Sequence, residues 1–308
     1  GGLSLAGIGR VRDPFEPLLG DTYEVPFDDA EALERALSER KVAAVVLEPI
    51  QVEAGVLVPR RGYLRDVRRL CHEHGALLVL DESRTGLGRT GQLFAHAEAE
   101  IAPDVLVVGE ALGGGVAAVA AVMTTPEIHD RAYGRLDRWD LQGSPWAVPP
   151  LSCLAARATL SAVQDEQLAA GAQRRGEDLR ERLRDAVGQH PFVTSVRGRG
   201  LLVGVELGPA RSGGLLGRLV PGLVGSVGRR LFGQWLALRL LERGIVCRPC
   251  AHQWNVLKLE PPLTVTDEQI DRAVTTTADI LGQYEELRPL LTDIGQRLGS
   301  QLLSGWTS

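Results

Sequence analysis

Two short, continuous apolar runs constrain the fold of this chain more than any other feature of its sequence. Residues 76–80 read Ala-Leu-Leu-Val-Leu and residues 105–108 read Val-Leu-Val-Val, and a β-branched run lies earlier, at 42–47. Strands that are apolar at every position are buried on both faces, as in a parallel sheet. A helical pattern at 63–74 separates the strand at 42–47 from the strand at 76–80, and such alternation is typical of α/β proteins. We therefore expect an α/β fold with a mostly parallel sheet.

The second half of the chain has a different pattern, which follows the proline pair Pro149-Pro150. We place a domain boundary there, with a partial large domain at 1–150 and a smaller α+β domain at 151–308. The elements expected in the smaller domain are helical patterns at 151–187, strands at 193–207 around the turn at 198–200, a helix at 236–243, a strand at 256–259 and a helix at 267–281. Thr266 and Gln269 have the spacing of a capping box for the last helix.

Residues 209–234 form an apolar insertion that is rich in glycine. Its arginines lie beside leucines, a pattern that fits an interfacial membrane segment or a partner-binding segment. Its glycines and Pro221 disfavour a long rigid helix. We therefore favour a lid-like insertion that packs on the protein itself.

Composition excludes several classes of function. The formal net charge of −5 gives no basic field for nucleic acid or anionic lipid. No run approaches the ~18 apolar residues of a membrane span, and the first residues do not resemble a secretory signal. We expect a cytoplasmic protein that binds neither nucleic acid nor membrane.

Four cysteines are too few for a disulfide scaffold and fit a reducing compartment. Cys247 and Cys250, followed by His252, have the spacing of half a metal site. No second Cys or His pair of suitable spacing accompanies them, so buried thiols beside a strand are the favoured interpretation and no metal site is expected. Cys71 and Cys153 lie in helical patterns and are expected in the core.

Several motifs in a fixed order resemble the class III pyridoxal-phosphate aminotransferases, of the acetylornithine, ornithine and putrescine type. The motifs are Val45-Val-Leu-Glu-Pro-Ile-Gln-Val-Glu53-Ala-Gly55, Gly62-Tyr-Leu64, Leu80-Asp-Glu-Ser-Arg-Thr-Gly-Leu-Gly-Arg-Thr-Gly91, Val105–Gly115, Val196-Arg-Gly-Arg-Gly200 and Asn255-Val-Leu-Lys258-Leu-Glu-Pro-Pro-Leu263. The resemblance implies fold type I, with pyridoxal 5'-phosphate as the cofactor. Family members of this kind work as dimers and move an amino group from an amine or amino acid to a 2-oxo acid.

The resemblance also implies roles for single residues. Asp81 corresponds to the acid that keeps the pyridinium nitrogen of the cofactor protonated. An acidic turn or cap residue is the alternative interpretation of Asp81. Glu53 and Lys258 correspond to an acid and an arginine that pair in ornithine-type relatives, where the arginine receives the substrate carboxylate. An exposed ion pair without function is the alternative interpretation.

The departures from the family pattern concern the same cofactor. Glu110 stands where the family has the Schiff-base lysine, Arg84 where it has a glutamine on the phenolic oxygen, and Ser83 where it has an aliphatic side chain on the ring face. Ser144 or Pro145 falls where a threonine reaches the cofactor phosphate from the neighbouring subunit. The N-terminal third of the family pattern, with its phosphate-binding loop, has no counterpart in this sequence. We expect a truncated homologue that lacks the lysine.

The chain has two lysines, so two other anchors were considered. Lys41 precedes a strand on the wrong side of the motif order. Lys258 is the better candidate, because a desolvated lysine becomes nucleophilic, but its amine would approach from the substrate side of the ring.

Three functions remain open at this point. The first is a degenerate homologue that keeps the fold for assembly, as a homodimer or with a related aminotransferase subunit. In that case Arg84 is expected to pair with Asp81 or Glu110. The second is an active aminotransferase that needs a missing N-terminal part or a partner and holds pyridoxal or pyridoxamine phosphate noncovalently. The third is a different reaction in which a buried Glu110 acts as an acid or base.

Overall fold

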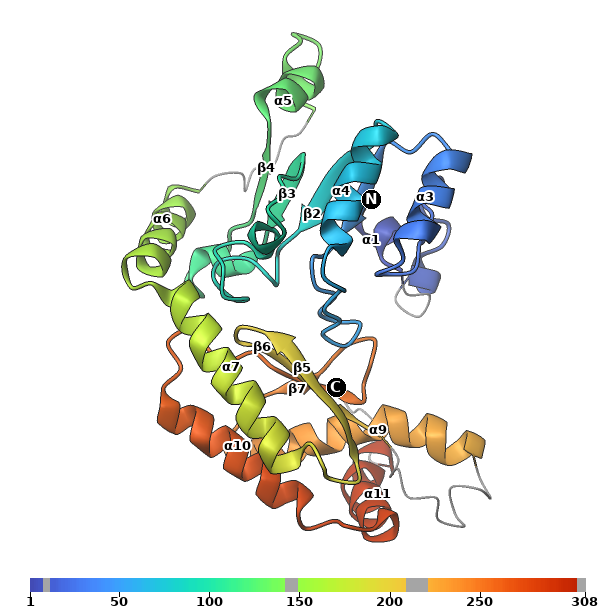
Figure 1. The fold of residues 1–308 in the computed structure, drawn as a ribbon, viewed down its shortest axis with the longest axis vertical. Helices are drawn as coiled ribbons and strands as arrows, with labels where there is room; N and C mark the ends of the chain where they lie inside the picture. The colour runs from blue at the N-terminus through green and yellow to red at the C-terminus, as the bar shows by residue number, and fades with distance from the viewer. Residues whose placement is uncertain (8–11, 142–148, 209–220, 304–308) are drawn as a thin grey trace. The chain divides into compact units, whose positions relative to one another are not determined.

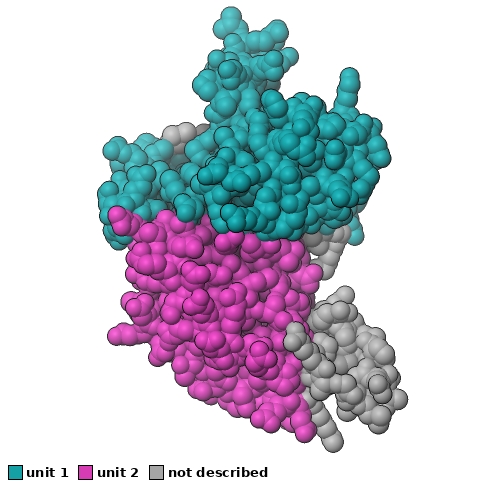
Figure 2. All heavy atoms as spheres, in the orientation of Figure 1, with its two compact units in different colours: residues 1–50, 59–87, 92–166 teal, residues 51–58, 88–91, 167–308 magenta. Residues whose placement is uncertain are grey.

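The computed structural model describes residues 1–7, 12–141, 149–208 and 221–303. They divide into two compact units. Unit 1 contains residues 1–50, 59–87 and 92–166, and unit 2 contains residues 51–58, 88–91 and 167–308 (Figure 2). Each unit is described by itself below.

Unit 1 is an α/β unit built on one four-stranded sheet (Figure 1). Its elements are α1 (Gly2–Leu5), η1 (Asp13–Phe15), α3 (Ala30–Glu39), β1 (Ala44–Leu47), α4 (Tyr63–Glu73), β2 (Leu77–Asp81), η2 (Ala95–Ala99), β3 (Val105–Val108), η3 (Glu110–Gly113), β4 (Ala121–Thr124), α5 (Pro126–Tyr133) and α6 (Pro150–Asp165). The strand order is β1-β2-β3-β4, with β1, β2 and β3 parallel and β4 antiparallel. This confirms the α/β fold and the mostly parallel sheet.

The core of unit 1 lies on one face of this sheet. Leu78, Leu80, Leu106 and Val108 are buried there together with residues of α3 and α4. The helix α4 packs on β2 because Val67, Leu70 and Cys71, at helical spacing, point to the same side. Cys71 is fully buried, as expected from its pattern.

Unit 2 combines an antiparallel sheet with long helices. Its elements are α7 (Leu168–Val187), β5 (Val193–Arg199), β6 (Leu202–Leu207), α9 (Pro221–Glu242), β7 (Arg248–Pro249), β8 (Val256–Leu259), α10 (Asp267–Leu281) and α11 (Leu287–Leu303). The strand order is β5-β6-β8-β7. This confirms the α+β character of the C-terminal part. The capping box of Thr266 and Gln269 at the start of α10 is also confirmed.

Two short segments belong to unit 2 although they come earlier in the chain. Segment 51–58 carries Glu53, which forms an ion pair with Lys258 of β8. Segment 88–91 carries Arg89, whose Nη1 donates to the carbonyl oxygen of Leu201 at 3.1 Å. Contacts with residues far along the chain, rather than sequence position, therefore place these segments in unit 2.

The division between the units does not coincide with the expected boundary at Pro149-Pro150. It falls after Glu166, because α6 packs against η3 and stays with unit 1. The helical region expected at 151–187 is two helices, since Gln167 adopts a left-handed conformation between them, with φ of 52°. A domain boundary at residue 150 stays a prediction.

The expectation that the insertion contains no long helix is wrong in its described part, and its lid-like packing stays a prediction. Residues 209–220 lie outside the described residues, but α9 begins at Pro221 and runs to Glu242, whereas only 236–243 was expected to be helical. Proline at the first position of a helix costs no hydrogen bond. Burial of Phe232, Trp235, Leu236 and Leu240 in the core of unit 2 outweighs the low helix propensity of the glycines.

Candidate functional site

The carboxyl ends of β2 and β3 form the candidate site of unit 1. These neighbouring parallel strands pair Asp81 with Val107, so both strands end at the same edge of the sheet. Glu110 follows β3 directly and opens η3. In open α/β sheets, ligands bind at this edge, outside the carboxyl ends of the strands. The residues expected in the site are therefore brought together by the fold.

Asp81 is the last residue of β2 and is half-buried. Its Oδ1 accepts a hydrogen bond from the backbone N–H of Ser83 at 2.9 Å, which turns the chain at the end of the strand. The position of Asp81 at the end of a strand agrees with the expected cofactor role, and its contact with the turn agrees equally with the alternative of an acidic turn residue. The cofactor role of Asp81 stays a prediction.

Arg84 and Glu110 form an ion pair at this edge. The Arg84 Nη1 atom lies 3.2 Å from the Glu110 Oε1 atom. The pairing of Arg84 with Glu110 is one of the two that the sequence led us to expect. The Glu110 side chain is 72% exposed. The acid–base alternative requires a buried carboxyl, and in the single chain this condition is not met.

Ser83 sits against the backbone of Gly109. A Cβ atom on Gly109 would lie 2.7 Å from the Cβ atom of Ser83, which no ordinary contact allows. Glycine at this position therefore lets the ends of β2 and β3 approach each other closely. The site depends on that approach, because it brings the Ser83–Arg84 turn next to Glu110.

Glu82 has a role that the sequence analysis missed. Its side chain is fully buried and accepts hydrogen bonds from the backbone N–H groups of Ala95, at 2.6 Å, and His96, at 2.9 Å. The Thr85 hydroxyl and the His96 ring also contact this carboxylate, at 3.2 and 2.7 Å. Glu82 thus ties the turn after Asp81 to the start of η2. An acid at the end of an otherwise apolar strand was the available signal.

In unit 2, Glu53 and Lys258 form the ion pair expected from the sequence. Lys258 lies in the middle of β8, and its side chain has no exposed surface. Its Nζ atom donates to Glu53 Oε1 and lies 3.5 Å from Glu260 Oε2. Arg248 Nη2 donates to Glu53 Oε1 at 3.0 Å, and the backbone N–H of Ala251 donates to Oε2 at 2.7 Å.

These contacts set the charge of Glu53. Burial by itself raises the pKa of the Glu53 carboxyl, but hydrogen bonds from Lys258 and Ala251 and the nearby charge of Arg248 lower that pKa below its usual value. A carboxylate is thus held ionised beside a buried ammonium. The alternative of an exposed ion pair is wrong in its exposure, because Lys258 is among the largest fully buried side chains. The substrate-binding role of Glu53 and Lys258 stays a prediction.

Neither lysine is well placed to anchor a cofactor. The Lys258 amine is enclosed and shared by two carboxylates, which opposes its action as a nucleophile. Lys41 precedes β1, so it lies at the amino end of the parallel strands, whereas Asp81 lies at their carboxyl end. In unit 1 these are opposite edges of the sheet.

Cys250 is a buried thiol, and Cys247 is partly buried. The Cys250 Sγ atom donates to the carbonyl oxygen of Val52 at 3.3 Å. Burial raises the pKa of both Cys247 and Cys250 to about 12, so neither is a thiolate at neutral pH. Among the described residues, no group of three or more His, Cys, Asp or Glu side chains has the arrangement of a metal site. Cys153 is only partly buried, on α6.

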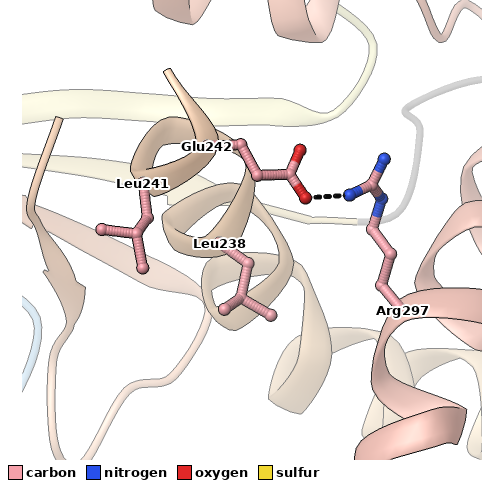
Figure 3. A pocket seen from close by; sticks show the side chains of 4 residues that line it. All are labelled: Leu238, Leu241, Glu242 and Arg297. Atoms are coloured by element: carbon pink, nitrogen blue, oxygen red, sulfur yellow. Dashed lines mark hydrogen bonds and ion pairs between the residues drawn. The ribbon is translucent and has the colours of Figure 1, made fainter. Parts of the chain in front are cut away.

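Some expectations fall elsewhere. Ser144 and Pro145 lie outside the described residues, so their phosphate role stays a prediction. None of the described helices has the length and apolar character needed to cross a bilayer. A pocket of about 280 Å³ in unit 2 is lined by Leu238, Leu241, Glu242 and Arg297 of α9 and α11 (Figure 3). Its lining includes neither Glu53 nor Lys258, and the Glu242–Arg297 ion pair occupies its polar side.

Comparison with solved structures finds the same fold in ornithine and acetylornithine aminotransferases. The ornithine aminotransferase of Toxoplasma gondii is 33% identical, with a TM-score of 0.80 over 93% of this chain and 62% of that chain. The acetylornithine aminotransferase of Elizabethkingia anophelis is 33% identical, with a TM-score of 0.72 over 84% of this chain and 62% of that chain. A transaminase from the marine bacterium Virgibacillus is 23% identical, with a TM-score of 0.80, and shares the fold over 92% of this chain and 64% of its own length.

The chain therefore spans less than two thirds of the length of these structures. The family model described as aminotransferase class-III matches residues 2–281, which cover most of unit 1 and unit 2 and stop before α11. Motif order, fold and family model agree, and the chain belongs to the class III aminotransferase family.

Proposed function

We propose that this chain is a class III aminotransferase homologue that does not form the Schiff base with its cofactor by itself. The ion pair between Arg84 and Glu110, at the edge that Asp81 shares, carries this proposal. Glu110, the acid of this ion pair, stands at the position of the family's lysine. A carboxylate at that position accepts a guanidinium, so the charges of Arg84 and Glu110 offset each other.

Pyridoxal phosphate is the cofactor of this family, and the Toxoplasma ornithine aminotransferase was found with partial occupancy of it at the active site. Covalent attachment needs an amine that condenses with the aldehyde and then moves a proton. Asp81 fits the partner of the pyridinium nitrogen by its position at the end of β2. Glu110 has no amine, and its Oε1 atom is held by Arg84. The residues present therefore do not fit a covalently held cofactor, and no catalytic step is derived through it.

The proposed role is assembly, as a homodimer or with a related aminotransferase subunit in the cytoplasm. Leu151 and Leu154 support it, because they lie one turn apart on α6 and are 74% and 61% exposed. An apolar stripe of this kind on a helix favours contact with another subunit. Glu53 and Lys258 keep their proposed place at the binding site for an amine or amino acid, where the enclosed ammonium of Lys258 holds the Glu53 carboxylate in position.

Titration with pyridoxal phosphate tests the proposal. The wild-type protein, Glu110→Lys and Glu110→Gln are each mixed with the cofactor, dialysed and compared by their absorption spectra. We expect a retained Schiff-base band only in Glu110→Lys, since the other two proteins lack an amine there. A retained Schiff-base band in the wild-type protein would contradict the proposal, whereas transaminase activity without that band would favour the alternative of a noncovalently held cofactor. No band in Glu110→Lys would show that Glu110 is not the limiting substitution.

A further inference from the structure

The charges at the carboxyl edge of β2 and β3 do not balance. Asp81 and Glu110 are two carboxylates at this edge, and among the described residues Arg84 is the one cation that forms an ion pair with either of them. Asp81 instead accepts the uncharged backbone N–H of Ser83. Two carboxylates and one guanidinium leave this edge of unit 1 with an excess of negative charge.

Each of the two carboxylates keeps an oxygen atom for a ligand. The Glu110 side chain is 72% exposed, and Arg84 contacts its Oε1 atom at 3.2 Å, so within the described part of the chain Oε2 has no ion-pair partner. Asp81 is half-buried, and the Ser83 N–H contacts its Oδ1 atom at 2.9 Å. An exposed ion pair contributes little stability, so the contact with Arg84 does not prevent Glu110 from binding a further cation.

The signs of these three charges follow a definite order. The edge presents a carboxylate on Asp81, then the guanidinium of Arg84, and next to it the carboxylate of Glu110. Pyridoxamine has the complementary order, because it combines a pyridinium nitrogen, a phenolate oxygen and, on the adjacent ring carbon, an ammonium group. By the motif order, Asp81 corresponds to the residue at the ring nitrogen and Arg84 to the residue at the phenolic oxygen. Glu110 then corresponds to the residue at the remaining, reactive carbon.

We propose that this edge binds the amine form of the cofactor noncovalently and in preference to the aldehyde form. The Glu110 carboxylate pairs with the ammonium of the aminomethyl group, while Arg84 and Asp81 pair with the phenolate oxygen and the ring nitrogen. An aldehyde is neutral and gives Glu110 no charge to pair with. The substitution that removes the amine for a Schiff base thus favours a ligand that carries its own amine.

The preference for the amine form rests on the proposed function, because a cofactor held as a Schiff base would occupy the same edge. It assigns Glu110 a binding role that the loss of a lysine does not by itself imply. The shared chemistry of the ligand is a pyridinium ring with an aminomethyl group, which occurs in pyridoxamine and in pyridoxamine 5'-phosphate. Titration with both compounds distinguishes these two sources.

Isothermal titration calorimetry of the 308-residue chain tests the preference. Pyridoxamine is compared with pyridoxine, which has the same ring and a neutral hydroxymethyl group in place of the aminomethyl group, and each is titrated with and without its 5'-phosphate. Glu110→Gln removes the charge at an exposed position and keeps the shape of the side chain. Glu127→Gln, at an exposed position on α5 of the same unit, is the matched control. Circular dichroism checks that each variant is folded.

We expect pyridoxamine, or its phosphate, to bind about fivefold or more tightly than the matching pyridoxine compound, because a charge-assisted hydrogen bond is stronger than a neutral one. Glu110→Gln should abolish this difference, and Glu127→Gln should keep it. Equal affinities in the wild-type chain would overturn the proposal, as would a difference that survives Glu110→Gln or no binding of any of the four compounds. A Schiff-base band with pyridoxal phosphate would contradict the proposed function instead, since none of these compounds has an aldehyde.

Discussion

Replacing Glu53 with glutamine is the perturbation whose consequence follows most closely from the structure. The substitution keeps the shape of the side chain and removes the charge that faces the buried ammonium of Lys258. Removing one member of a buried ion pair costs about 3–5 kcal/mol, because the remaining charge stays out of water. Here Glu260 remains 3.5 Å from Lys258, and the Glu53 side chain is 24% exposed. We therefore expect a smaller loss, of about 2–3 kcal/mol in the free energy of unfolding.

The pair of variants around this site separates charge from packing. Lys258→Met leaves Glu53 with Arg248 and the Ala251 N–H, so we expect a loss of about 1–2 kcal/mol. The double variant Glu53→Gln/Lys258→Met removes both charges of the Glu53–Lys258 pair, and replacing a buried pair in this way is often close to neutral. The two losses should therefore not add, with a coupling energy of roughly 2 kcal/mol.

Urea unfolding, followed by circular dichroism and tryptophan fluorescence, measures these differences. Trp235 is buried in the core of unit 2, so its emission reports on the unit that contains Glu53 and Lys258. The reasoning would be refuted if Glu53→Gln lost less than ~0.5 kcal/mol, the value typical of surface pairs, or if the two single losses were additive.

The same variant has a defined pH dependence. The folded-state pKa of Glu53 is lowered relative to its ordinary value of 4.5, so the ionised carboxylate stabilises the folded protein. This contribution is complete above pH 4.5 and is lost as the pH falls through the folded-state pKa. The stability gap between wild type and Glu53→Gln should thus be constant from pH 6 to 8 and narrow below about pH 4.5.

Three further changes test other parts of the account. Gly109→Ala should lower the free energy of unfolding by about 1–3 kcal/mol, because the new Cβ would lie 2.7 Å from Ser83. Gly295→Ala on α11 should stabilise the protein slightly, because no atom lies within 4 Å of its Cβ. Equal melting temperatures of the two variants would contradict this prediction. Glu82→Gln should lower the free energy of unfolding by about 2–4 kcal/mol, since the backbone N–H groups of Ala95 and His96 keep only one acceptor oxygen between them. Differential scanning calorimetry measures this loss, and Glu127→Gln, at an exposed position, is the control. Burial raises the pKa of Cys247 and Cys250 to about 12. At pH 8 both thiols should therefore react with a disulfide reagent more than ~100-fold more slowly than free cysteine, and the rate should rise about tenfold per pH unit. Fast, pH-independent labelling of either cysteine would contradict this prediction.

Local pattern was enough to predict two of the short strands. The strands at Val105–Val108 and Val256–Leu259 were predicted with the observed bounds, because each is a short apolar run that ends at a turn or proline. The capping box of α10 was predicted for a similar reason, since it needs only residues of the helix itself.

Elements that depend on distant contacts were missed. The helix α9 begins at Pro221 although its glycines disfavour a helix, since core burial of residues such as Trp235 decides the outcome. The strand β4 forms by antiparallel pairing with β3, and the periodicity of residues 121–124 does not predict this pairing. The complete burial of Lys258 was likewise hidden, because the type of a residue does not show which carboxylates surround it.

Borohydride reduction of the wild-type protein after incubation with pyridoxal phosphate tests the central claim most directly. The chain has only two lysines, Lys41 and Lys258, so peptide mapping by mass spectrometry covers every side-chain amine. The account predicts that Lys258 carries no pyridoxyl label, because its ammonium is enclosed by Glu53 and Glu260, and that Lys41 carries at most a trace. A stoichiometric pyridoxyl label on either lysine would show that the chain still forms the Schiff base and would contradict the account.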